Sequence, residues 1–215
     1  MPRQPRRASA IALTALIAVG LAACGSSSSS NSSSSSAAST TATSSATSST
    51  SSSGAPATVI GRSTAVTVNP VIAAALKKAS ITVAPVAPAT AKKVVFVFPE
   101  SGGQVVVATL AGTINHTGGL TFSHAGKSVT LTNFVINTTS KQLTATAGGG
   151  SLPVFDLGLA SLKRVSGPGG TIVATNIKLD LTSQAASALN SGLGVTLFKG
   201  GMHFGIATLT VAVKP

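Results

Sequence analysis

Ser128-Val-Thr-Leu-Thr-Asn-Phe-Val-Ile136 is the stretch that decides the fold class. Val129 and Leu131 alternate with threonines, as in a strand that buries one face. The alternation changes phase at Asn133, and Phe134 and Ile136 then continue it, which predicts a β-bulge at this asparagine.

Segments of the same β-branched character lie on both sides of this stretch, at 94–98, 104–110, 119–122, 142–146, 152–157, 171–173, 177–181 and 206–213. Glycine-rich pieces separate them and predict turns at 102–103, 118–119, 125–126, 148–150 and 167–170. Many short strands at spacings of roughly 8–12 residues are typical of mainly β folds. We therefore expect an antiparallel sandwich or barrel.

Two short helices should interrupt the strands. Asn69 is an N-cap residue followed by Pro70, and 71–78 then runs rich in alanine and ends in lysine. Thr182-Ser183 provides a similar cap for 184–191, with Gly192 as the expected C-cap.

The two capped helices sit in similar surroundings. Residues 66–76 align with 179–189, and 81–83 align with 195–197, so strand, helix and strand recur near both ends. We interpret this as a pseudo-symmetric architecture; the alternative is chance, because alanine and valine are so common in this chain.

The N-terminal segment has the pattern of an export signal. Arg3, Arg6 and Arg7 precede an apolar run of about 16 residues, shorter than the roughly 20 that a membrane helix needs. Leu21-Ala22-Ala23-Cys24 follows and resembles the lipobox of bacterial lipoprotein signals, of which Leu21, Ala22 and Ala23 fill the first three positions. The resemblance implies cleavage before Cys24 and palmitate-type lipid on its sulfur; the alternative is an ordinary signal with a chance cysteine.

The amino-acid composition divides the rest of the chain into a linker and a folded domain. Cys24 is the single cysteine, and 25–54 is almost entirely serine, threonine and alanine, which predicts a disordered linker. We therefore expect a signal peptide over 1–23, a lipidated cysteine and linker over 24–54, and one β-rich domain over 55–215. The expected location is the extracytoplasmic face of the cell membrane, held by a lipid anchor.

Charge and residue content exclude several function classes. The chain carries a net charge of +12, which falls to about +9 without the three signal arginines. Tyrosine and tryptophan are absent, and basic residues are not interleaved with aromatic ones as base stacking requires, so we expect no nucleic-acid partner. The excess of lysine fits anionic lipid headgroups or envelope polymers, or a solvated surface. The sequence does not indicate an oligomeric state.

Catalytic groups are scarce. Glu100, Asp156 and Asp180 are the only acids, and no histidine or cysteine spacing matches a metal site. Asp180 lies between two leucines and should face solvent, whereas Asp156 is either an outward polar residue or a satisfied buried acid. We therefore expect no enzyme activity and no metal site, and an enzyme on a β scaffold is the rival class.

His116 and His124 are the candidate ligand-binding residues. His116 lies in Leu110-Ala-Gly-Thr-Ile-Asn-His-Thr-Gly-Gly-Leu-Thr-Phe122, and Leu131-Thr-Asn-Phe134 follows. These two pieces resemble the HtaA-type haem-transport domains of actinobacterial envelopes, over roughly 94–147. The resemblance implies haem as a cofactor, with iron held by an axial tyrosine, a residue this chain lacks.

These observations favour a non-enzymatic binding or structural module of the cell envelope. A sandwich or barrel interior is a usual place for a small apolar ligand, and such a ligand would need an interior void above about 300 Å³. A filled core is the alternative. HtaA-like haem binding is the second hypothesis.

Overall fold

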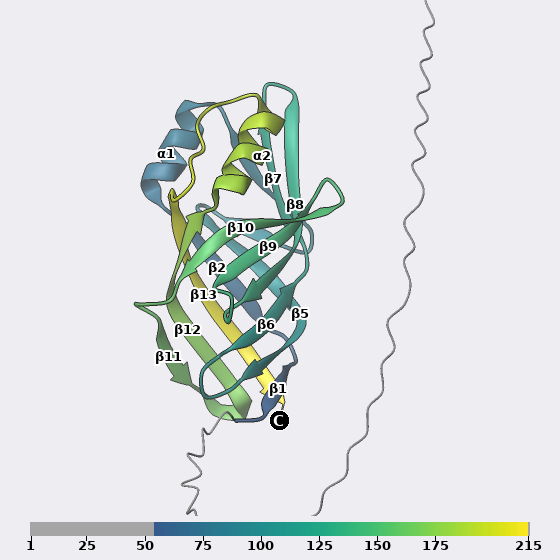
Figure 1. Ribbon diagram of the computed structural model, residues 1–215, viewed down its shortest axis with the longest axis vertical. Coiled ribbons are helices and arrows are strands. Elements are labelled where there is room, and N and C mark those ends of the chain that lie inside the picture. The colour runs from purple at the N-terminus through teal and green to yellow at the C-terminus, as the bar shows by residue number, and fades with distance from the viewer. Residues whose placement is uncertain (1–53, 215) are drawn as a thin grey trace, which may run out of the picture. The chain divides into compact units, whose positions relative to one another are not determined.

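The computed structural model describes residues 54–214, and its main feature is a closed ring of eight antiparallel strands (Figure 1). Each strand pairs with the next, and the last returns to the first. In ring order they are β2 (Ser63–Val68), β5 (Val95–Val106), β6 (Gly112–His116), β8 (Lys127–Asn137), β9 (Gln142–Ala147), β10 (Gly150–Gly158), β12 (Thr171–Leu181) and β13 (His203–Lys214). The expected mainly β fold is confirmed, in its barrel form.

Shorter strands extend the ring at both ends. β1 (Pro56–Val59) pairs with the ends of β13 and β5, and β11 (Lys163–Ser166) pairs with β12 beside the short turn η1 (Pro168–Gly170). β3 (Thr82–Val86) pairs with β7 (Gly119–His124), which pairs with β8, while β4 (Thr90–Lys92) pairs with β5. Figure 1 shows both helices and the β7–β8 hairpin at one end of the ring and β1 at the other.

Both helices are capped as the sequence predicts at their N-termini. α1 (Pro70–Lys78) begins where the Asn69 side chain accepts a hydrogen bond from the Val71 amide at 2.9 Å. α2 (Ser183–Leu193) begins where Thr182 accepts one from Ala185 at 3.0 Å. A threonine or asparagine cap stabilises a helix by about 1 kcal/mol.

The predicted C-cap of α2 is wrong. Gly192 lies inside the helix, and Gly194, with φ of 69°, ends it in the left-handed conformation. Gly192 has a packing role instead, because a Cβ there would collide with Cγ2 of Val129 on β8. The glycine therefore lets α2 lie close against the ring.

Two further expectations about the strands have different outcomes. The bulge at Asn133 is confirmed: its φ is 51°, and the β8–β9 register shifts between Thr132 and Val135. The turn predicted at 102–103 is wrong, because both glycines lie within β5, and a Cβ on Gly103 would collide with the Thr113 carbonyl of β6. These glycines let the backbones of β5 and β6 approach closely, and they do not reverse the direction of the chain.

The internal repeat holds for strand and helix but not for the second strand. β2 leads into α1 and β12 leads into α2, and both strands pair with β13. After α1 the chain forms β3, whereas 195–197 forms no strand and β13 begins only at His203. The proposed pseudo-symmetry therefore covers strand and helix alone.

Candidate functional site

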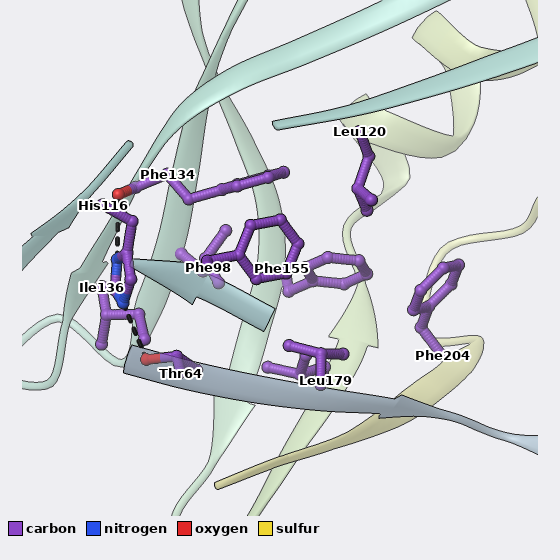
Figure 2. A pocket seen from close by; sticks show the side chains of 11 residues that line it. Thr64, Phe98, His116, Leu120, Phe134, Ile136, Phe155, Leu179 and Phe204 are labelled. Carbon is purple, nitrogen blue, oxygen red and sulfur yellow. Dashed lines mark hydrogen bonds between the residues drawn. The ribbon is translucent and has the colours of Figure 1, made fainter. Parts of the chain in front are cut away.

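The interior of the ring is almost filled by side chains. Figure 2 shows a small space among Phe98, Phe134, Phe155, Leu179 and Phe204, and its volume is about 20 Å³. That is room for about one water molecule. Phe98 and Phe134 meet edge to face with ring centroids 5.1 Å apart, which explains the tight fit. The interior therefore offers no space for an apolar ligand, and the filled-core alternative applies.

His116 lies at the edge of this space and is fully engaged. It ends β6 and is 4% exposed, so it is a core residue and not part of a polar loop. Its Nε2 lies 2.7 Å from Thr64 Oγ1 and its Nδ1 lies 3.1 Å from the Phe134 carbonyl oxygen (Figure 2). Burial lowers the pKa of His116 to about 4, partly offset by hydrogen bonds to the backbone. A neutral imidazole with both nitrogens occupied is a structural group.

Glu100 lies opposite His116 in the pairing of β5 with β6, and sequence reasoning missed its burial. Neither carboxylate oxygen has a hydrogen-bond partner among the described residues. Burial raises the pKa of Glu100 to about 7, although the nearby backbone amide of Arg62 offsets part of the rise. The middle of β5 therefore holds an acid whose protonated form is favoured by burial.

A groove lies beside α1. Its volume is about 380 Å³, within the roughly 300–1,000 Å³ of small-molecule sites. Its floor is entirely apolar and buried, formed by Val68, Leu76, Ile81, Phe96 and Phe204. We call this hollow the α1 groove. A larger hollow over β5 and β6, of about 590 Å³, has no buried residue in its lining and so lacks such a floor.

The rim of the α1 groove is positively charged. Lys77 of α1 and Lys93 of the β4–β5 turn line it, and no acidic residue does. Lys93 has φ of 58°, and Ser80, which also lines the rim, has φ of 53°. This left-handed region favours glycine, so each position holds a side chain where glycine would be less strained.

His124 lies near the tip of the β7–β8 hairpin, in a second and more polar hollow of about 290 Å³. Its Nδ1 lies 3.2 Å from the Leu193 carbonyl oxygen, at the C-terminal end of α2. Lys127, opposite His124 in the hairpin, lies over Gly194. The Lys127 ammonium complements the dipole of α2 at this end, and His124 contacts the last carbonyl group of the helix.

The remaining acids come together on the outer wall. Asp156 is opposite Asp180 across β10 and β12, and Asp180 Oδ1 lies 2.9 Å from Nδ1 of His203. Asp156 is exposed, and the Asp180 and His203 side chains are 38% and 36% exposed. Asp180 thus faces outward as expected, and of the two alternatives for Asp156 the structure shows the outward polar residue. The described residues contain no group of three His, Cys, Asp or Glu side chains arranged to hold a metal ion.

The lipobox residues Leu21, Ala22 and Ala23 and the lipid-bearing Cys24 lie outside the described residues, as do the signal and most of the linker. Between residues 54 and 214, neither helix is long and apolar enough to cross a membrane.

Comparison with known proteins identifies the architecture. No family model and no curated protein matches the sequence. The crystal structure of the C-terminal domain of HtaA from Corynebacterium glutamicum is similar, with a TM-score of 0.57 and 16% identity, over 74% of this chain and 99% of that one. The fold is that of the HtaA C-terminal domain. A domain-swapped dimeric variant of the same domain also matches, with a TM-score of 0.48 and 17% identity, over 68% of this chain and 94% of that one.

The resemblance to HtaA-type domains seen in the sequence is therefore confirmed at the level of fold. The residues of the site do not extend it to haem iron. No histidine, cysteine or methionine lines the α1 groove, and the chain has no tyrosine. His116 is buried with both nitrogens occupied. The groove thus offers an apolar surface and two cations, but none of the usual axial ligands of haem.

Proposed function

We propose that this domain is a non-enzymatic binding module of the cell envelope that holds a small apolar anion in the α1 groove. One observation carries the proposal: a buried apolar floor lies beneath a rim with two lysines and no acid. Apolar surface supplies most of the affinity in such sites, and a few charged groups fix the orientation of the ligand. The long lysine side chains can reach an anionic group without being buried themselves.

Fluorescence titration with anilinonaphthalene sulfonate (ANS), an apolar anion, tests this proposal. We expect Lys93→Gly to weaken ANS binding about fivefold, equivalent to about 1 kcal/mol for an exposed charge contact. The substitution should not unfold the domain, because φ at Lys93 suits glycine. Lys141→Gly is the matched control: Lys141 also has a left-handed φ, 55°, and lines none of the hollows described above. Equal loss in both variants, or no loss in either, would overturn the proposal.

Haem is the second candidate, and the HtaA-like fold favours it. Haem is an apolar ring with two carboxylates, so it could pack its ring on the apolar floor of the α1 groove and place its carboxylates near the two lysines of the rim. Titration with haemin and with iron-free protoporphyrin separates the two possibilities. Equal affinities would mean that the groove binds the ring and carboxylates, whereas tighter binding of haemin would mean that the protein also supplies a ligand to the iron.

We further propose that the mature chain is anchored by lipid on Cys24, with the serine-rich linker as a tether. Two acyl chains hold a protein stably at a membrane, where one chain does so only weakly. Labelling of the wild-type chain by radioactive palmitate, and no labelling of Cys24→Ala, is the expected result; label retained in the variant would exclude this anchor.

A further inference from the structure

The outer surface around β11 carries exposed apolar and basic side chains together. Val165 of β11 is 66% exposed, and Ile60, which connects β1 to β2, is 61% exposed. Lys163 of β11, Arg62 before β2 and Lys214 at the end of β13 are also exposed. We call these residues the β11 patch. Figure 1 shows β11 and β1 toward the end of the ring opposite both helices.

Strand register places most of the β11 patch on one face of the sheet. Val165 is opposite Val173 of β12, and Val173 is opposite Thr210 of β13. Side chains of opposed residues share a face, and so do residues an even number of positions apart on one strand. Lys163 is two positions before Val165, and Lys214 is four positions after Thr210. The two lysines and Val165 therefore project from the same outer face.

Ile60 and Arg62 extend this face on the far side of β13. The Ile60 amide donates a hydrogen bond to the Ala212 carbonyl oxygen at 2.8 Å. The Arg62 guanidinium donates one to Thr171 Oγ1 at 3.5 Å, and Thr171 is opposite Ala212 across β12 and β13. Thr171 lies two positions before Val173 and so belongs to the same face. The Arg62 side chain therefore reaches across β13 on the face of the patch.

No acid offsets the positive charge of the β11 patch. The only acids between residues 54 and 214 are Glu100, whose carboxylate is buried, and Asp156 and Asp180, which lie toward the helical end of the ring. The one ion pair in this part of the chain joins Asp180 to His203. The three cations of the patch therefore have no acidic partner among the described residues.

The place of the patch in the chain indicates what it contacts. Exposed aliphatic side chains among lysine and arginine are typical of surfaces that lie on anionic membranes. The patch borders β1, because Lys214 is opposite Thr58 of that strand. The chain that precedes β1 leads back to Cys24, the proposed lipid site. The patch therefore lies at the end of the domain that the anchor would join.

A second copy of the chain suits the patch less well. β12 is the one neighbour of β11 among the described strands, so the other edge of β11 could pair with β11 of a second copy. Such pairing would bring Lys163 and Arg164 of both copies together, and like charges on paired strands are destabilising. An anionic lipid surface meets the same cations favourably.

From these observations we infer that the β11 patch docks the domain on an anionic membrane surface. The two aliphatic side chains insert between lipid headgroups, and the three cations contact headgroup phosphates. This inference goes beyond ligand binding in the α1 groove and rests only on the proposed lipid anchor. An anchor at Cys24 would hold the patch near the bilayer at a high effective concentration, so a weak attraction is sufficient.

Sedimentation with lipid vesicles tests the inference. The protein is the mature chain from residue 24 with Cys24→Ala, so that no acyl chain contributes to binding. We expect binding to phosphatidylglycerol vesicles at low salt, at least about tenfold weaker binding to phosphatidylcholine vesicles, and release at about 0.5 M salt. Equal binding to both lipids, or binding to neither, would overturn the inference.

Variants locate the contact. Lys163→Gln should weaken binding about fivefold, the effect of one cation near an anionic surface, and Val165→Ser about tenfold, the effect of one buried valine. Lys78→Gln and Val71→Ser are the matched controls, because both side chains are exposed on α1, at the other end of the ring. The controls should bind as wild type does. An equal or larger loss in the controls, or no loss in any variant, would overturn the inference.

The same variants separate this inference from its rivals. If the wild type self-associates and Val165→Ser makes it monomeric in sedimentation equilibrium, the patch belongs to a second copy and the inference is wrong. ANS binds the α1 groove, which contains no residue of the β11 patch, so Lys163→Gln should leave ANS binding unchanged. Palmitate labelling of the wild-type chain reports on the anchor independently of vesicle binding.

Discussion

Glu100 and His116 lie opposite each other on β5 and β6, and burial favours the neutral form of each. The pKa of Glu100 is raised to about 7, so the unfolded chain loses this proton first and stability falls as pH rises from about 4.5 to about 7. The pKa of His116 is lowered to about 4, so stability falls as pH drops from about 6.5 to about 4. Between about pH 4.5 and about pH 6.5 the two groups change the free energy of unfolding in opposite directions. Above about pH 6.5 only Glu100 still makes this free energy depend on pH.

Glu100→Gln should therefore stabilise the domain at alkaline pH and not at acidic pH. The amide has the shape of the protonated acid but never acquires a charge, so the cost of burying a charge disappears. Thermal unfolding at about pH 8 and about pH 5 measures the effect. The melting temperature should rise above that of the wild type at the higher pH and change little at the lower pH. An equal change at both values would contradict the titration of Glu100.

At the scale of elements, the close contact between α2 and β8 depends on Gly192. A Cβ at this position would collide with Val129, so Gly192→Ala should destabilise the domain by about 1–3 kcal/mol, as expected for overpacking. Chemical denaturation of the two single variants and the double variant forms the test. Val129→Ala should restore most of the stability lost in Gly192→Ala, and additive losses would exclude direct contact between the two sites.

Local elements were the part of the fold that sequence could predict. The Asn69 and Thr182 caps and the Asn133 bulge depend on neighbours within a few residues, and all three are present. Gly192 and the glycines at 102–103 were misassigned because their roles depend on strands distant in sequence. A glycine that ends an element and one that admits a neighbouring backbone look the same in a sequence.

The candidate site was predictable only in part, for the same reason. His116 was noticed by its type and surroundings, yet its burial depends on Thr64 of β2, which is 52 residues away. The α1 groove was not predicted, because its floor combines β2, α1, β5 and β13. One local signal is present in the sequence: Lys93 belongs to the pair Lys92-Lys93, and it lies at a turn with φ of 58°.

At the scale of the whole molecule, Phe204 separates the α1 groove from the interior. Its side chain lines both the groove and the small central space, and it contacts Phe155 with ring centroids 5.1 Å apart (Figure 2). It is 1% exposed, so the ring also contributes to the core. The depth of the groove is therefore limited by one aromatic side chain.

Phe204→Ala should join the two spaces and let the groove accept a longer apolar chain. The variant should lose about 3–5 kcal/mol of unfolding free energy, as for other buried phenylalanines, and should prefer longer alkyl chains than the wild type does. Phe198→Ala is the matched control, since Phe198 is 3% exposed but lines neither space. Titration with alkyl phosphates of increasing length measures the preference. The same preference in both variants would show that Phe204 is not the barrier.

The closure of the ring by β13 sets the order in which this chain can fold. β13 ends at Lys214 and pairs with both β12 and β2, so its contacts with β2 join segments about 140 residues apart in sequence. Neither β2 nor β12 can complete its pairing until the last dozen residues are available. Contacts of such long range make folding slow, in the millisecond-to-second range of β proteins. A chain that emerges from a ribosome or a translocation channel with its N-terminus first must therefore keep the ring open until β13 has emerged.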